Sequence, residues 1–347
     1  MLTPDKINLL LAPLANAKAI LVAVSGGPDS TALLLMTSHW AGRRGAPRVE
    51  AATVDHGLRE GAAAEAAAVA ALCRKLGVPH HTLQWRGEKP KSRMQERARD
   101  ARYSLLTECA RGIGAEIVVT AHHLDDQAET VLFRLLRGSG IGGLAGMAAS
   151  TNRDGVALAR PLLGLAKADL VAYCHAEGAP FVHDPSNDDP RYARTRMRAL
   201  LKSLASEGLD APALARLASR AARVDEALAS QTDAAETRLR LVAAGRCEAA
   251  LLLAEPVEII QRLVTATIAR VGGREPSRVG LEKVEALVAG LRVALLAGER
   301  FSANICGARV RSNGKGTVWV EREPRRGRAV AGDLKPTAGD SPRSGGG

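Results

Sequence analysis

The chain has 347 residues, enough for two domains, and no apolar run approaches the ~20 residues of a membrane span. It shows no signal-peptide pattern and no CxxC pair among its five cysteines, so we expect a cytoplasmic protein with reduced thiols, no disulfide framework and no membrane partner. The formal charge of +11 favours a polyanionic partner such as nucleic acid, although a genome that favours Arg and Ala would give the same excess.

The first strong pattern, residues 19–36, predicts a strand, a tight turn and a helix. Residues 19–24 are apolar and partly β-branched, and residues 31–36 are helix formers. Between them, Gly26 and Gly27 allow positive φ and close approach to a ligand, while Pro28 suits a first helical turn. The turn therefore presents backbone N–H groups at the positive end of a helix dipole, which favours a bound phosphate.

The polar side chains of this turn strengthen the phosphate interpretation. Ser25 and Ser30 add two hydroxyls, and Asp29 adds a carboxylate that suits a magnesium ion. The segment matches neither GxxxxGK nor GxGxxG. An ordinary strand-to-helix turn uses similar residues and is the alternative, but such a turn has no need of Asp29. We therefore predict a phosphate site at residues 25–30.

An alternation of strands and helices follows this turn. We expect strands at residues 48–54, 79–85 and 116–121, and helices at 61–76, 92–111 (with Ser92 as N-cap) and 124–136. This order predicts an α/β fold with a doubly wound, Rossmann-like parallel sheet, right-handed crossovers and helices on both faces. The carboxyl ends of its strands would carry the loops 25–30, 55–59 and 122–127, where such sheets bind ligands.

The rest of the chain predicts a more helical organisation. We expect an irregular glycine-rich loop at 136–147, a fifth strand at 157–163, helices at 167–178 and 191–204, and a turn cluster at 183–190. Beyond these, helices at 211–244, 256–271 and 281–289 and strands at 309–311 and 317–321 are expected. We predict a catalytic domain at 1–210, a helical linker and smaller C-terminal α+β domain at 211–323, and a disordered tail at 324–347.

Two further loops and one helix carry candidate functional residues. Asp55 and His56 follow the second strand, where they form either a strand-exit turn or, as position favours, a nucleotide contact. On the helix expected at 92–111, Arg99 and Arg102 are adjacent on one face. They are either solvated or placed to neutralise charge on a transferring phosphoryl group.

The segment AHHLDDQAET, residues 121–130, is the second strong pattern. Acids in a first helical turn favour the helix dipole, which explains one aspartate but not the two histidines or Glu129. A metal site is an alternative, but His122 and its neighbour would point apart. Asp126 and Glu129, three residues apart, share one helix face and form an acid pair suited to a substrate ammonium group, which is the interpretation we favour.

Several motifs together resemble one known family. SGGPDS is similar to the SGGxDS loop of the N-type ATP pyrophosphatases, which cleave ATP between its α- and β-phosphates. Residues 20–200 resemble the tRNA(Ile)-lysidine synthetases. After SGGPDS they contain further motifs in the order seen in that family: VDHGLR, ARDARY, HHLDDQAET, RGSGIGGLAGM, RPLL, DPSN and RTRMR. The resemblance implies a PP-loop enzyme that adenylates O2 of the wobble cytidine in tRNA(Ile) with anticodon CAU. The side-chain amine of L-lysine then displaces AMP at C2 to form lysidine.

The resemblance also implies roles for individual residues. The ATP phosphates would lie on the loop formed by Ser25, Gly26, Gly27, Pro28, Asp29 and Ser30, with Asp29 assisting Mg²⁺. Arg102 would stabilise charge and His122 would lie close to the reacting phosphate. Asp126 and Glu129 would receive the ammonium group of lysine, and either of them could take its proton.

A basic cluster is the expected tRNA contact. Arg191, Arg194, Arg196 and Arg198 suit tRNA phosphates, with an exposed solvated face as the alternative. Thr195 stands where the family usually has Asn. Residues 211–323 resemble the family weakly, and a homodimer remains open.

Three rival functions fit parts of the sequence. A tRNA cytidine thiolase would share the fold but needs CxxC pairs, which this chain lacks. A non-catalytic RNA-binding protein would not need an intact SGGPDS loop and acid pair. A small-molecule amidating enzyme would give no reason for the Arg191 cluster.

Overall fold

The computed structural model describes residues 2–42, 45–57, 61–86, 94–182, 193–273, 275–276, 279–314 and 316–324, with only the backbone described at 95, 193 and 194. The predicted turn at 183–190, the predicted cap Ser92, Arg191 and nearly all of the predicted tail lie outside these residues. The chain divides into two compact units, Met1–Ala227 and Leu228–Gly347. No helix in the described ranges combines the length and apolar character that a bilayer crossing requires.

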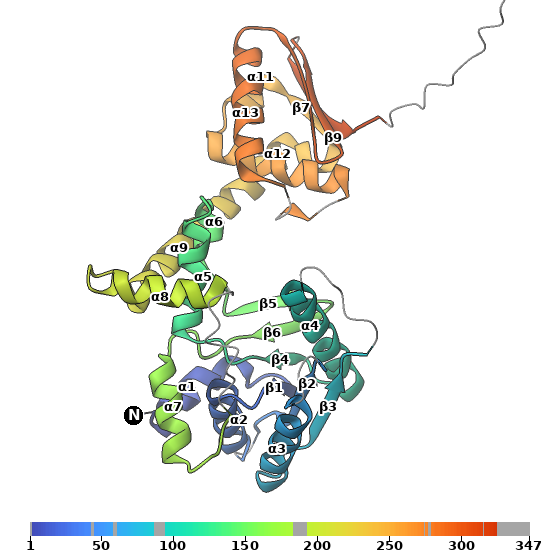
Figure 1. The fold of residues 1–347 in the computed structure, drawn as a ribbon. Coiled ribbons are helices and arrows are strands. Elements are labelled where there is room, and N and C mark those ends of the chain that lie inside the picture. Colours follow the sequence, from blue (N-terminus) through green and yellow to red (C-terminus); the bar gives the residue numbers. More distant parts are fainter. Residues whose placement is uncertain are drawn as a thin grey trace, which may run out of the picture. The chain divides into compact units, whose positions relative to one another are not determined.

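The first unit is built on a six-stranded sheet with the order β3-β2-β1-β4-β6-β5 (Figure 1). All neighbouring strands pair in parallel except the edge strand β5. The strands are β1 Ala19–Ala23, β2 Arg48–Asp55, β3 His80–Gln84, β4 Ile117–Val119, β5 Ser150–Arg153 and β6 Val156–Ala159. The predicted doubly wound α/β fold is confirmed.

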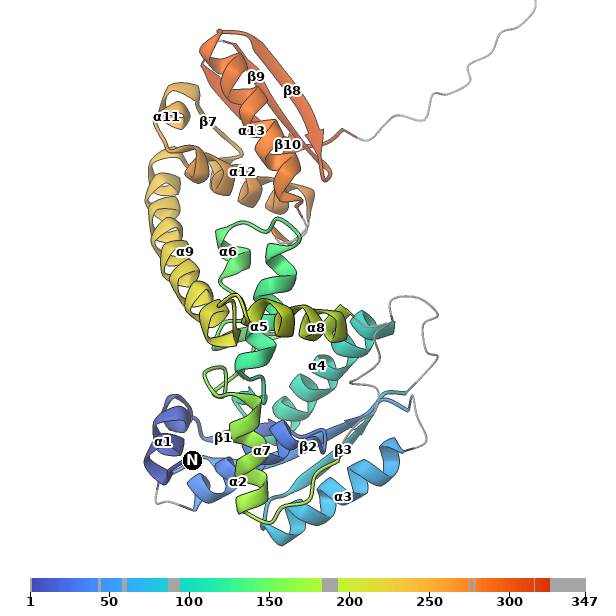
Figure 2. The ribbon, with the colours of Figure 1, turned by 60° about the vertical axis from the view of Figure 1, so that its left-hand side comes forward.

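Alternate side chains of the sheet bury into two apolar layers. Ile20 and Val22 of β1 pack with helices α1 Pro4–Leu11, α2 Pro28–Ala41, α3 Ala62–Lys75 and α7 Lys167–Ala176. Leu21, between them in sequence, packs with α4 Met94–Ile113 on the other face. Figure 2 shows these helices on either side of the strands. Because successive strand residues face opposite ways, a nearly all-apolar strand such as β1 requires cover on both faces.

The sequence analysis missed the strand β5 and the short helix α6 of this unit. β5 is polar and exposed, so it lacks the apolar alternation that identifies a strand. Asp154 and Gly155, with φ of 53° and 82°, form the two-residue hairpin turn that returns β5 to β6. The glycine-rich loop expected to be irregular contains α6 Ile141–Leu144.

A third apolar cluster of this unit joins three helices. Ala128, Val131 and Leu132 of α5 Leu124–Leu135 bury against α8 Ala193–Ala205 and the first half of α9 Ala211–Leu239. This packing explains why the boundary between the two units falls inside α9, after Ala227.

The second unit is a four-stranded antiparallel sheet, in the order β7-β10-β9-β8, packed with helices. Its elements are α10 Leu241–Ala244, β7 Arg246–Glu248, α11 Ala249–Leu253, α12 Val257–Gly272, α13 Leu281–Leu296, β8 Arg300–Ile305, β9 Ala308–Asn313 and β10 Thr317–Arg322. The predicted α+β character is confirmed. β7 and β8 were missed, although Phe301, Ala303 and Ile305 of β8 alternate with polar residues, a pattern that predicts a strand.

Close packing at the end of α12 gives a stability prediction for the second unit. A Cβ atom on Gly272 would lie 2.3 Å from the backbone oxygen of Cys306, in the turn between β8 and β9. We therefore expect Gly272→Ala to destabilise this unit by about 1–3 kcal/mol, since neither backbone can yield cheaply. Hydrogen exchange of amides in α12 and β9 measures the change. Gly112→Ala is the control, because a Cβ atom on this helical glycine would have no neighbouring atom within 4 Å. Equal exchange rates in the two variants would refute the prediction.

Candidate active site

The predicted phosphate loop, residues 25–30, joins the end of β1 to the start of α2 and is closed by its own serines. The Ser25 N–H donates to Oγ of Ser30 at 3.1 Å, and the Ser30 hydroxyl donates to the Gly27 carbonyl at 3.1 Å. The two Oγ atoms lie 3.2 Å apart. Gly27 caps α2 without a side-chain hydrogen bond, and Pro28 occupies the first turn. These contacts hold the backbone of the predicted anion site at this helix start.

Contacts from α3, α7 and the segment after α7 hold this loop. The Val182 N–H donates to the Gly26 carbonyl at 2.8 Å, and the Cys174 thiol donates to the Pro28 carbonyl at 3.3 Å. Gly26 has a φ of +86°, and a Cβ there would approach Val69 to 3.4 Å. The loop therefore favours glycine at position 26 because of its backbone conformation, whereas the contact with Val69 is an ordinary van der Waals distance.

Asp29, in the first turn of α2, carries an unsatisfied oxygen. Its Oδ2 lies 3.5 Å from Nε2 of His123, while its Oδ1 is buried and has no hydrogen-bond partner among the described residues. Such an orphaned carboxylate oxygen fits a cation. The described ranges contain no group of three His, Cys, Asp or Glu side chains that could hold a metal ion alone. A Mg²⁺ ion at Asp29 would take its other ligands from phosphate and water, as this ion commonly does.

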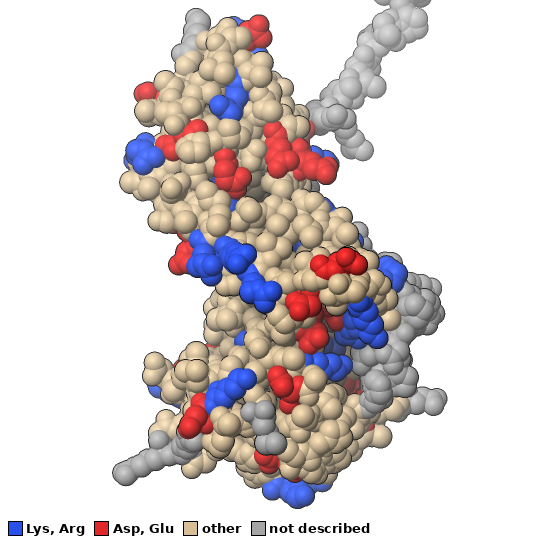
Figure 3. Space-filling model, turned by 90° about the vertical axis from the view of Figure 1, so that its left-hand side faces the viewer, with Lys and Arg blue, Asp and Glu red and all other residues tan. Residues whose placement is uncertain are grey.

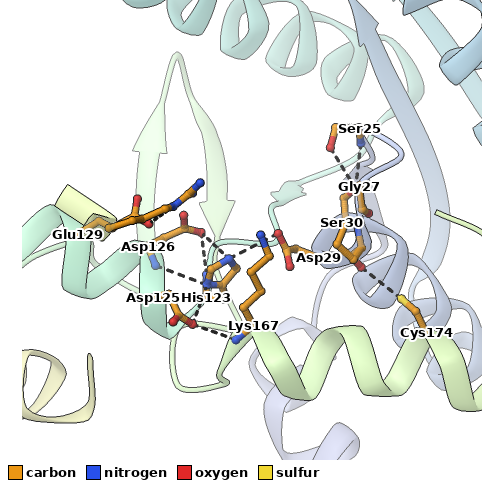
Figure 4. A network of polar contacts seen from close by, with 12 residues as sticks. Ser25, Gly27, Asp29, Ser30, His123, Asp125, Asp126, Glu129, Lys167 and Cys174 are labelled. Atoms are coloured by element: carbon orange, nitrogen blue, oxygen red, sulfur yellow. Dashed lines mark hydrogen bonds and ion pairs between the residues drawn. The ribbon is translucent and has the colours of Figure 1, made fainter. Parts of the chain in front are cut away.

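His123, which the sequence did not single out, connects the loop to α5. Its buried ring has Nε2 3.5 Å from Asp29 and 3.4 Å from Asp126, and Nδ1 3.5 Å from Asp125 (Figure 4). The backbone N–H of His123 also donates to the Asp126 carboxylate at 3.2 Å. Asp125 in turn accepts the backbone N–H of Lys167 at 2.9 Å. One imidazole thus joins carboxylates from the starts of two helices.

The surrounding carboxylates keep this imidazole charged. Burial opposes protonation, but hydrogen bonds to Asp125 and Asp29 and the charges of Asp126 and Asp29 raise the pKa of His123 to about 10. The hydrogen bond with His123 lowers the pKa of Asp125 to about 2 against the effect of burial. In an imidazolium both ring nitrogens are donors, so Nδ1 donates to Asp125. The Asp126 amide, 3.4 Å from Nδ1, then makes no hydrogen bond with it.

The raised pKa of His123 predicts a pH-dependent stability. A group whose folded pKa is raised stabilises the fold fully below its unfolded pKa, near 6.5, and loses this effect as the pH rises towards about 10. We expect the unfolding free energy of the wild type to exceed that of His123→Gln by on the order of a few kcal/mol at pH 6. Urea unfolding in magnesium-free buffer from pH 6 to pH 10 should show this difference shrinking. A difference that stays constant over the range would contradict the assignment.

His122 has a different environment from its neighbour. Its Nδ1 lies 2.9 Å from the hydroxyl of Thr120, which follows β4, and this contact fixes the ring at the carboxyl end of the sheet. The two histidines therefore point to different partners and do not form a shared metal site.

The second predicted loop meets α4 through Arg102. The Nε and one terminal nitrogen of Arg102 lie 3.3 and 3.2 Å from Nε2 of His56, and the His56 ring packs edge-on against Trp85. Asp55 accepts the Gly57 N–H at 2.8 Å, which stabilises the turn after β2. His56 and Arg102 are thus brought together, while the carboxylate of Asp55 stabilises the turn after β2.

Glu129 of the predicted acid pair already has a cationic neighbour. Its carboxylate is buried, and Nε of Arg198 on α8 donates to its Oε1 at 2.6 Å. Arg196, on the same helix, is exposed, whereas the side chain of Arg194 lies outside the described part of the chain. The predicted lysine-binding and tRNA-binding sets therefore meet at the pair Glu129–Arg198, which no spacing in the sequence indicates.

Comparisons with known proteins identify the domain and the family of this chain. A PP-loop domain model matches residues 3–204. A tRNA(Ile)-lysidine synthase of Rhodopseudomonas palustris is 48% identical over 92% of this chain and 95% of that protein. Another, of Methylobacterium sp., is 45% identical over 95% of this chain and 98% of that protein.

The fold also has a solved counterpart. A U34-tRNA thiolase of Methanococcus maripaludis, solved with its 4Fe–4S cluster, covers 62% of this chain and 77% of its own with a TM-score of 0.54. At 16% identity this similarity shows the fold alone. The similarity to the lysidine synthases, by contrast, extends over nearly the whole sequence. The chain therefore belongs to the tRNA(Ile)-lysidine synthase family of PP-loop proteins.

Proposed function

We propose that this chain uses ATP to join L-lysine to C2 of the wobble cytidine of tRNA(Ile) with anticodon CAU, releasing AMP and pyrophosphate. One observation carries the proposal beyond family membership. Asp29 of the phosphate loop and Asp126 of α5 both lie within 3.5 Å of the same buried His123 ring. A triphosphate on the loop and an ammonium group at the acid pair would therefore be neighbours, as a transfer between them requires.

In the first half-reaction, O2 of the cytidine attacks the α-phosphorus of ATP and pyrophosphate leaves. The N–H groups at the start of α2 and the serine hydroxyls would hold the phosphates, and Oδ1 of Asp29 would hold Mg²⁺. The ion, when bound, neutralises phosphate charge. Arg102 and His122 would stabilise the charge that develops around the transferred phosphoryl group.

In the second half-reaction, the side-chain amine of lysine forms a bond to C2 while the C2–O2 bond breaks and O2 leaves with AMP. The amine must first lose a proton, which Asp126 or Glu129 would accept. The same acids would hold lysine beside the adenylated base, which raises the effective concentration of the amine at C2.

Exposed arginines on α8 and α9 would bind the tRNA backbone. Arg196 is exposed on α8, and Arg216, Arg220 and Arg223 of α9 are exposed at helical spacing on one face. Figure 3 shows Lys and Arg side chains gathered on the part of the surface that carries these helices. We extend this role to Arg191, Arg194 and the region 211–323, and we place the reaction in the cytoplasm.

Thiolation of tRNA is not favoured. Burial raises the pKa of Cys73 and Cys174 to about 11 and that of Cys247 to about 12, so these thiols stay protonated at neutral pH. With no CxxC pair in the sequence, a cluster-binding site of the thiolase kind has no ligands to build on.

Labelled L-lysine tests the proposed function directly. The protein is incubated with ATP, labelled lysine and transcripts of tRNA(Ile) with anticodon CAU or of the methionine tRNA that shares this anticodon. We expect ATP-dependent label in tRNA(Ile) and none in the methionine tRNA. Absence of label in both, or equal label in both, would refute the proposal.

A further inference from the structure

Free L-lysine presents three ionic groups, and the proposed reaction uses one of them. Its side-chain amine attacks the base, while the α-ammonium and α-carboxylate remain as a zwitterionic head. The acids Asp126 and Glu129 suit ammonium groups, but a carboxylate needs a cation or a set of N–H donors. To distinguish lysine from a simple diamine, the site therefore needs a positive group or N–H donors near the acid pair.

Arg198 is placed to supply that group. Its Nε donates to Oε1 of Glu129 at 2.6 Å, and Glu129 itself is only 4% exposed. The Arg198 side chain keeps 34% of its surface exposed, so a solute can reach it. Apolar packing of Met197 and Leu200 of α8 with Ala128 and Leu132 of α5 holds the two helices together, which fixes the pair in place.

The shape of a guanidinium group allows it to bind two carboxylates. It carries five N–H donors in a planar fork, so the edge opposite a first carboxylate can serve a second. Glu129 can accept from Arg198 and from an ammonium group through the same carboxylate. Together, Arg198 and Glu129 present a positive and a negative group side by side, which is the complement of a zwitterionic head.

The order of residues along α5 gives this binding a direction. Asp126 lies three residues before Glu129, about 4.5 Å nearer the start of the helix. Figure 4 shows Glu129, Asp126, His123 and Asp29 following one another towards the phosphate loop. A lysine whose head is held at Glu129 and Arg198 would extend its four-carbon stem towards Asp126 and the loop. Of the two acids, Glu129 would then receive the α-ammonium group and Asp126 the side-chain amine and its proton, which narrows the assignment proposed above.

We propose that Arg198 binds the α-carboxylate of L-lysine and that the pair Arg198–Glu129 sets the direction of the amino acid in the site. The inference rests on the proposed function and adds a specificity-determining residue to it. It gives Arg198 a role in lysine binding, whereas the exposed Arg196 of the same basic cluster would bind tRNA.

Substrate analogues combined with Arg198 variants test this role. L-Lysinamide and cadaverine, which lack the carboxylate, are compared with L-lysine in joining to tRNA(Ile). We expect the wild-type KM for lysinamide to exceed that for lysine about 10- to 100-fold. Arg198→Gln should raise the KM for lysine by a similar factor and change that for lysinamide by less than about twofold. Arg198→Lys should restore part of the discrimination, and Lys202→Gln, an exposed site on the same helix, should change neither KM.

Three outcomes would overturn the inference. If Arg198→Gln raised the KM for lysine and for lysinamide equally, Arg198 would only position the Glu129 side chain. A changed KM for tRNA with unchanged KM for lysine would make Arg198 a tRNA contact. A wild type that uses lysinamide as well as lysine would refute the inference whether or not the variants fold. A wild type that joins none of these amines to tRNA(Ile) would instead refute the proposed function itself.

Discussion

Replacing Asp29 with alanine is expected to reduce the release of pyrophosphate from ATP by about a hundredfold or more. Oδ1 of this residue is a buried carboxylate oxygen without a hydrogen-bond partner in the described structure, at the start of the helix that follows the phosphate loop. Without it, a magnesium ion would lose the protein ligand that we propose, and the charge of the leaving pyrophosphate would not be neutralised. Pyrophosphate release in the presence of tRNA(Ile) and lysine measures the effect.

A matched variant separates this role from a general effect on helix starts. Asp169 is an exposed aspartate in the first turn of α7, in the same unit, so Asp169→Ala should retain pyrophosphate release. Thermal unfolding of both variants shows whether the loss of the Asp29–His123 contact has destabilised the fold. Full activity of a folded Asp29→Ala protein would mean that the loop is only a turn.

Neutralising the acid pair is expected to uncouple the two half-reactions. In Asp126→Asn/Glu129→Gln, the ammonium groups of lysine lose both anionic partners, and we expect the KM for lysine to rise about a hundredfold. Adenylation of tRNA should continue, because the phosphate loop is unchanged. The transfer of label from the α-phosphate of ATP to tRNA serves as the internal control. Lysine dependence equal to that of the wild type would remove the lysine-binding assignment.

The sequence predicted the parts of the fold that local patterns determine. The apolar run of β1, the glycines after it and the strand–helix alternation predicted a parallel sheet and a strand–turn–helix unit at residues 19–36, and both are present. β5 could not be recognised from hydrophobicity, because a short edge strand exposed to water needs no apolar face. The Asp154–Gly155 turn was the available signal for its hairpin.

The candidate site shows where sequence reasoning ends. The motifs named Asp29, Asp126 and Glu129, but their arrangement depends on His123, whose contacts with Asp29 join the starts of α2 and α5. The backbone N–H of His123 donates to the carboxylate of Asp126, three residues later, as in one half of a capping box, and this spacing was the one local sign of its role. The contact of Glu129 with Arg198 crosses 69 positions of the sequence, so only the packing of α5 on α8 reveals it.

The central claim is that one site adenylates the cytidine and then transfers lysine to it. A pulse–chase experiment tests this most directly: ATP labelled in its α-phosphate is first incubated with protein and tRNA(Ile) in the absence of lysine, and unlabelled ATP and L-lysine are then added. The account predicts that label enters the tRNA in the pulse and leaves as AMP in the chase, while the tRNA gains lysine. Label that never enters the tRNA, with AMP formed only once lysine is present, would show that lysine is activated instead and would contradict the account.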